Sequence, residues 1–130
     1  DLPERLSAVH LLIGRAGAST VAETQVAGRP AILVPYPYAI DDHQTRNAYA
    51  VDEAGGGWLM PEPSFTPSAL AARLDSLLGL PAILEKAAAG AKAIGIQDAA
   101  KLLADMVCEL LPNNGNGNGA DGPDDEGRAA

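Results

Sequence analysis

Short apolar runs alternate with longer amphipathic stretches through much of the chain. Three runs, residues 11–13, 31–34 and 58–60, have the length and apolar character of buried strands. A helix capped by Ser19 or Thr20 and ended by Gly28 and Pro30 follows the first run. A helix over residues 43–54 follows the second. This alternation predicts an α/β fold, a Rossmann-like parallel sheet with flanking helices.

Three more helices are predicted after the third run. Thr66 caps the first of them, with Pro67 at its first position, the second covers residues 81–93, and the third begins near Asp98. The last helix carries an apolar stripe at helical spacing, which predicts core packing. The stripe consists of Ala99, Leu102, Leu103, Met106, Val107 and Leu110. Cys108, the only cysteine, lies on this apolar helix and is predicted to be a buried structural thiol.

The junction between the first strand and its helix consists of small residues around one cation. Gly14 and Gly17 allow close approach of the backbone to another group, and Arg15 between them adds a positive charge. The free N–H groups at the helix start favour an anion, and a diphosphate fits there. The second junction, rich in proline and then polar, lies beside it in a parallel sheet. Together the two junctions predict a crevice for a phosphorylated ligand.

The residues around Glu23 allow two interpretations of its role. The spacing Thr20-x-x-Glu23 is that of a capping box, in which the glutamate serves the helix start. Alternatively, its carboxylate accepts hydrogen bonds from the two hydroxyls of a ribose.

The longer pattern resembles a known enzyme family. The run Gly-Arg-Ala-Gly-Ala-Ser-Thr-Val-x-Glu, followed by Gly-x-Pro, Val-Pro-Tyr-Pro and Asp-His-Gln-x-x-Asn-Ala, is similar to that of MurG-type transferases. These bacterial enzymes add N-acetylglucosamine to a lipid-linked muramyl-peptide precursor of peptidoglycan. The resemblance covers roughly residues 1–111 and is far more specific than a lone glycine-rich loop.

The resemblance implies that the matching positions bind the donor, and it implies a specific contact for most of them. The diphosphate of UDP-N-acetylglucosamine is implied to lie against Arg15, Gly17, Ala18, Ser19 and Thr20. Glu23 matches the ribose-binding glutamate, and Gln44 matches a glutamine that binds sugar hydroxyls. His43 stands where some members carry a second glutamine, so it is counted among the donor-binding positions. Asn47 matches a family asparagine to which the sequence assigns no specific role.

The resemblance also implies that the chain is only part of an enzyme. Such enzymes are two-domain GT-B glycosyltransferases, and residues 1–111 would be part of the C-terminal, donor-binding domain. The N-terminal domain would bind the lipid acceptor, carry the general base and meet the membrane surface peripherally. No catalytic residue is therefore assigned in this chain. The expected enzyme is cytoplasmic, at the inner face of the bacterial cell membrane.

The implied reaction is transfer of N-acetylglucosamine to the lipid-linked acceptor with inversion at the anomeric carbon. Two alternatives stay open at this point. One is the small subunit of a split lipid-linked N-acetylglucosamine transferase, which works only with a membrane partner. The other is a non-catalytic module that binds a nucleotide sugar or a protein.

Composition narrows the possible partners. The formal net charge is −8, of which the last 19 residues carry −3 and the rest −5. An acidic domain is a poor candidate for nucleic-acid binding, which relies on Lys and Arg. Residues 112–130 are rich in Asn, Gly, Asp and Pro, and we expect a disordered acidic tail there.

Neither a membrane span nor a metal site is predicted. No segment approaches the about 20 apolar residues that a spanning helix needs, and the first residues lack the basic start of a signal peptide. The adjacent carboxylates Asp41 and Asp42, beside His43, are expected to serve the start of the second helix rather than a metal. We expect no cofactor.

Overall fold

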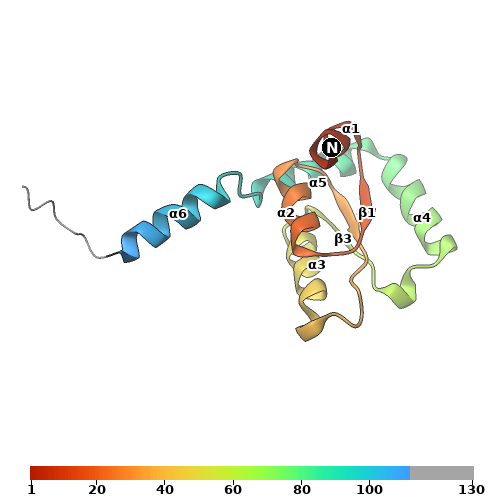
Figure 1. Cartoon of the computed structure of the whole chain (residues 1–130). Coiled ribbons are helices and arrows are strands. Elements are labelled where there is room, and N and C mark those ends of the chain that lie inside the picture. Colours follow the sequence, from red (N-terminus) through yellow and green to blue (C-terminus); the bar gives the residue numbers. More distant parts are fainter. Residues whose placement is uncertain (112–130) are drawn as a thin grey trace, which may run out of the picture. The chain divides into compact units, whose positions relative to one another are not determined.

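The computed structural model describes residues 1–111, and residues 1–97 form one compact unit. A three-stranded parallel sheet in the order β1-β2-β3 lies at its centre (Figure 1). The strands are β1 (Leu12–Gly14), β2 (Ala31–Leu33) and β3 (Gly57–Leu59). The sheet predicted from the alternation is confirmed, with each strand within one residue of its predicted bounds. The predicted tail, residues 112–130, lies outside the described residues.

Two helices connect the strands and cover one side of the sheet. The helix α2 (Ala18–Val26) joins β1 to β2, and α3 (His43–Glu53) joins β2 to β3 after a short 3-10 turn, η1 (Ile40–Asp42). Figure 1 shows α2 and α3 on the same side of the strands. The main core cluster lies between these helices and the sheet, and it consists of Ala16, Val21, Ala31, Leu33, Ala48 and Val51.

Both connecting helices end in the same hydrogen-bonded motif. After α2, the N–H groups of Gly28 and Arg29 donate to the carbonyls of Gln25 and Thr24. Gly55 and Gly56 repeat this arrangement after α3. Gly28 and Gly55 have φ of 61° and 70°, the left-handed backbone that this helix-ending motif requires. The glycines therefore end the helices where the sequence predicts.

Two further helices complete the compact unit. After β3 and a 3-10 turn, η2 (Glu62–Ser64), the chain forms α4 (Pro67–Leu78) and α5 (Pro81–Ala93). The predicted cap of α4 is confirmed, because the Ala69 N–H donates to Thr66 Oγ1 over 3.2 Å. The helix α5 contacts α2, α4 and β3. Its buried small residues, Ala87 and Ala91, permit this close packing.

The first helix, α1 (Leu2–Ala8), was not predicted from the sequence. It has seven residues, too few to be stable alone in water. Arg29, which follows α2, stabilises its end: Nε donates to the Leu6 carbonyl over 2.8 Å and Nη2 to the Ser7 carbonyl over 2.7 Å. Leu6 is buried, so both a core contact and a cationic cap hold this short helix.

Three packing predictions are wrong. The first strand was expected to be buried on both faces, but Ile13 is exposed, because it points to the face opposite the core cluster that Leu12 contacts. The last helix, α6 (Ala99–Leu110), begins where predicted, but none of its residues is buried. The residues of its apolar stripe are all exposed. Cys108 is an exposed free thiol rather than a buried one.

Candidate functional site

The candidate site lies where the three strands end. Because the strands are parallel, the loops after Gly14, Leu33 and Leu59 all leave the sheet at its carboxyl edge. This edge is the place where open α/β sheets bind their ligands. The predicted residues after β1 and at the start of α3 both belong to this edge.

The turn that opens α2 leaves its backbone donors free. Gly17 is the N-cap residue, with φ −65° and ψ 148°, and no side chain caps the helix. Ser19 and Thr20 were predicted as caps, and this is wrong, because the helix already begins at Ala18. The N–H groups of the first turn therefore have no partner within the helix. A Cβ added at Gly17 would meet nothing within 4 Å, so the space beside the turn is open.

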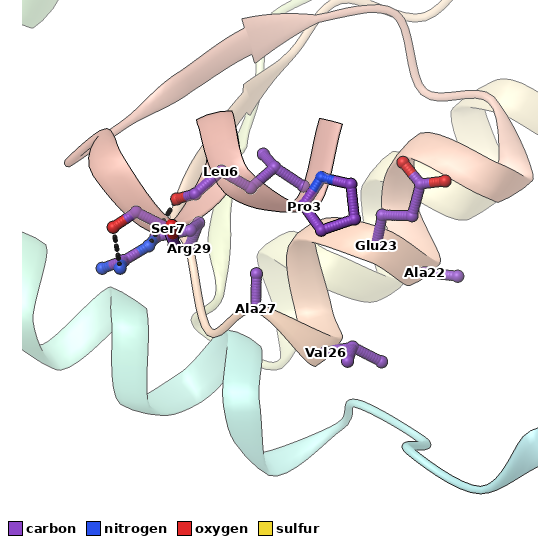
Figure 2. A pocket seen from close by; sticks show the side chains of 8 residues that line it. All are labelled: Pro3, Leu6, Ser7, Ala22, Glu23, Val26, Ala27 and Arg29. Atoms are coloured by element: carbon purple, nitrogen blue, oxygen red, sulfur yellow. Dashed lines mark hydrogen bonds between the residues drawn. The ribbon is translucent and has the colours of Figure 1, made fainter. Parts of the chain in front are cut away.

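Glu23 lies one turn further along α2 and does not form the capping box. Within residues 1–111 its carboxylate makes no hydrogen bond and no ion pair, and its side chain is exposed. Figure 2 shows it beside Pro3 and Leu6 of α1. These residues line a largely apolar cavity of about 410 Å³ between α1 and α2. The carboxylate is thus available to a ligand at the edge of an apolar surface.

Arg15 points toward the ends of the other two strands. Its Nη1 donates to the Val34 carbonyl over 3.4 Å, to the Pro35 carbonyl over 3.2 Å and to the Glu62 carboxylate. Its guanidinium carbon lies 5.6 Å from the centroid of the Tyr36 ring, within cation–π distance. Arg15 therefore connects the loops that follow all three strands.

The start of α3 is connected to the same edge by two amides. The Asn47 side-chain amide donates to the Ala16 carbonyl over 3.0 Å, which fixes the turn before α2. Gln44 Oε1 accepts a hydrogen bond of 2.9 Å from the Tyr36 N–H. The structure thus gives Asn47, which the sequence left unassigned, a contact that positions the turn. Within residues 1–111 the Gln44 amide nitrogen makes no hydrogen bond, so both of its donors are available to another group.

His43 and the two aspartates before it lie at the start of α3. The imidazole is exposed, and its Nδ1 lies in hydrogen-bonding contact with the Ile40 carbonyl of its own turn. Asp41 and Asp42 have φ of 52° and 51°, in the left-handed region that Asp tolerates better than most residues. Neither side chain caps α3. In residues 1–111, no group of three or more His, Cys, Asp or Glu side chains is placed to hold a metal ion.

Sequence reasoning missed the partners of Arg15. Glu62 is 47 residues away and Tyr36 lies in a proline-rich loop, so neither stands out by spacing. One signal in the sequence could have found Glu62. In a parallel sheet, the residues that follow the third strand leave the sheet at the same edge as Arg15. This rule, applied to the segment from Pro61, predicts that Glu62 lies near Arg15.

The chain matches a family model over residues 1–103, and that model describes the glycosyltransferase family 28 C-terminal domain. The chain belongs to this family. It is 64% identical over 130 residues to a protein of Rhodospirillum centenum named UDP-N-acetylglucosamine--N-acetylmuramyl-(pentapeptide) pyrophosphoryl-undecaprenol N-acetylglucosamine transferase. A protein of the same name from Paramagnetospirillum magneticum is 59% identical over 113 residues, 87% of this chain.

Solved structures agree with this family. The crystal structure of Acinetobacter baumannii MurG matches 85% of the chain with a TM-score of 0.77 and 33% identity. A glycosyltransferase of kitacinnamycin matches with a TM-score of 0.60 and 23% identity, which shows the fold alone. The predicted fold class, an α/β sheet from the C-terminal domain of a GT-B glycosyltransferase, is confirmed.

The chain spans only part of these relatives. It covers 34% of the Rhodospirillum protein, 30% of the Paramagnetospirillum protein and 31% of the Acinetobacter MurG chain. Within the part that the structure describes, no helix is long and apolar enough to cross a bilayer.

Proposed function

We propose that this chain is the donor-binding part of an inverting N-acetylglucosaminyltransferase of peptidoglycan biosynthesis. The full enzyme would transfer N-acetylglucosamine from UDP-N-acetylglucosamine to undecaprenyl-pyrophosphoryl-N-acetylmuramyl-pentapeptide, which converts lipid I to lipid II. The observation that carries the proposal is the uncapped start of α2, with open space beside Gly17, in a chain of glycosyltransferase family 28. The Glu23 carboxylate, further along the same helix, has no partner within residues 1–111. The relatives' names supply the sugar and the acceptor.

The diphosphate of the donor would lie against the start of α2. The N–H groups of Ala18, Ser19 and Thr20 and the open face of Gly17 offer donors without a competing side chain. Arg15 adds a cation at the same edge. These donors would also stabilise the charge that grows on UDP as it leaves, because they are already oriented before the reaction.

The remaining donor contacts follow from the same arrangement. Glu23 would accept hydrogen bonds from the ribose hydroxyls, because its carboxylate is exposed and without a partner in residues 1–111. Gln44 would donate its amide to sugar hydroxyls while its oxygen stays bonded to Tyr36. His43 would add a weaker contact at the same helix start. Asn47 would act indirectly, through the turn that it holds.

The acceptor, the general base and the membrane contact belong to the rest of the enzyme in this proposal. The acceptor hydroxyl needs a base to remove its proton. We assign no residue of this chain to that role. The enzyme would work in the cytoplasm, peripherally bound to the inner face of the cell membrane.

A chimera tests the proposal. Residues 1–130 would replace the matching segment of the Rhodospirillum centenum relative, which is 64% identical over that length. We expect the chimera to transfer N-acetylglucosamine from the UDP donor to the lipid-linked acceptor and the isolated chain to show no transfer. A folded chimera that binds neither UDP nor the donor would contradict the proposed function. Donor binding without transfer would instead favour a non-catalytic module.

Within the chimera, Glu23→Gln tests the ribose contact. Hydrogen bonds to a charged acceptor contribute roughly 1.5–3 kcal/mol, so donor affinity should fall about 10- to 100-fold. Thermal stability should not change, because Glu23 makes no capping contact. Glu85→Gln on α5 is the control with the same change in charge and should bind the donor like the parent. Equal donor affinity in Glu23→Gln and the parent would show that the ribose assignment is wrong.

A further inference from the structure

The cation at the site is already paired with an acid. Arg15 and Glu62 form an ion pair through Arg15 Nη1 and Glu62 Oε2, and their side chains are 50% and 41% exposed. Both belong to loops that leave the carboxyl edge of the sheet, after β1 and after β3. A carboxylate this close offsets much of the charge that Arg15 would present to an anionic ligand.

Arg15 does not depend on Glu62 for its position. The carbonyls of Val34 and Pro35 accept from the same Nη1, and the Tyr36 ring lies against the guanidinium. An exposed ion pair adds little to such an arrangement, since both charges remain largely in contact with water. Loss of the acid should therefore leave the guanidinium where it is.

The guanidinium also keeps donors for a ligand. Every hydrogen bond that Arg15 makes to the described residues uses Nη1. Nε and Nη2 have no partner within residues 1–111. A phosphate group can therefore bind the open side of Arg15 while Glu62 stays on the other side.

We propose that Glu62 sets the affinity of this site for the diphosphate by opposing it at Arg15. The carboxylate weakens the attraction of the guanidinium for both the donor and the UDP product, which lets UDP leave. The proposal rests on the donor-binding function proposed above. It adds a residue that touches no ligand and acts through Arg15.

The test compares Glu62→Gln with the parent in the chimera. Removing one exposed opposing charge should tighten UDP binding about three- to fivefold at low salt, the scale of an exposed ion pair. The affinity for uridine, which has no phosphate, should not change. The donor KM should fall together with the inhibition constant of UDP, while kcat does not rise. At about 1 M salt, where the Debye length is about 3 Å, the difference should nearly vanish.

Two controls separate this effect from a change in overall charge or fold. Glu85→Gln removes the same charge from α5 and should leave UDP affinity at the parent value. In an Arg15→Gln background, Glu62→Gln should have no effect on UDP affinity, because the two residues act as one pair. Thermal unfolding confirms that each variant is folded, and Glu62→Ala provides a second variant if Glu62→Gln is not.

The outcomes distinguish this proposal from the one on which it rests. The parent chimera could bind UDP while Glu62→Gln binds it equally or more weakly. That result would contradict the role proposed for Glu62 and leave the proposed donor site unchanged. An equal gain for uridine and UDP also overturns it, because Glu62 would then not act on the phosphates. A parent chimera that binds no UDP contradicts both proposals.

Discussion

Two glycines of the compact unit have opposite surroundings, and the difference separates a binding role from a structural one. Gly17 at the start of α2 faces open space, and its φ of −65° suits any residue. Gly57 in β3 lies so close to the Ala31 carbonyl that a Cβ would overlap it. The same substitution should therefore affect ligand binding at the first position and folding at the second.

Gly17→Ala is expected to keep the fold and weaken donor binding. The free energy of unfolding should change by less than about 1 kcal/mol, because alanine is only a poorer N-cap residue than glycine. The new methyl group stands where the diphosphate would approach, so donor affinity in the chimera should fall about tenfold or more. Calorimetric titration with UDP and thermal unfolding measure the two effects.

Gly57→Ala is the matched comparison. It should destabilise the protein by at least about 2 kcal/mol, since two paired strands must move apart to admit the methyl group. Unchanged donor affinity in a stable Gly17→Ala variant would show that the diphosphate does not approach this turn.

At the scale of elements, α1 depends on a residue from another part of the chain. Arg29 satisfies two carbonyls at the end of α1, and Leu6 anchors the helix in the core. The helix forms one wall of the cavity that Glu23 lines (Figure 2). Stability of α1 and the shape of the cavity beside Glu23 are therefore linked through Arg29.

Arg29→Ala should destabilise the chain by about 1–3 kcal/mol, because it removes two charge-assisted hydrogen bonds from a partly buried position. Limited proteolysis should then cut within residues 1–8 sooner than in the parent. Arg73→Ala on α4 removes an exposed arginine that forms no bond within residues 1–111, and it should change stability by less than about 0.5 kcal/mol. Equal stability of the two variants would show that Arg29 does not hold α1.

At the scale of the whole molecule, the core is confined to one part of the described chain. Every buried residue among residues 1–111 lies between Leu6 and Ala91. The compact unit ends at Gln97, and α6 follows with no buried residue. The compact unit therefore contains the sheet together with the apolar core that packs against it.

Shortened chains test this location of the core. Chains ending at Leu111 and at Gln97 should both unfold cooperatively, with melting temperatures within about 4 °C of the full chain. A larger shift would correspond to more than about 1 kcal/mol in a domain of this size. Circular dichroism should show the loss of one helix in the shorter chain. Loss of the cooperative transition on removing residues 98–111 would show that α6 contributes to the core.

The sequence by itself determined the three strands, the helices from α2 onward and the family, but not α1. Apolar runs located the strands, Gly28 and Pro30 marked the end of α2, and the motif around Gly17 and Glu23 indicated the family. These features depend on neighbours within a few residues, which local sequence specifies.

The tertiary structure decided the partners within the site. The contacts of Arg15 with Glu62 and of Asn47 with Ala16 join residues 47 and 31 positions apart. The cap that Arg29 forms on α1 was also decided by the tertiary structure, as was the exposure of Ile13 and Cys108. The physical reason is that these contacts and exposures depend on which surfaces meet when the sheet and helices pack. The spacing of apolar and polar residues along one segment does not show which other segment will pack against it.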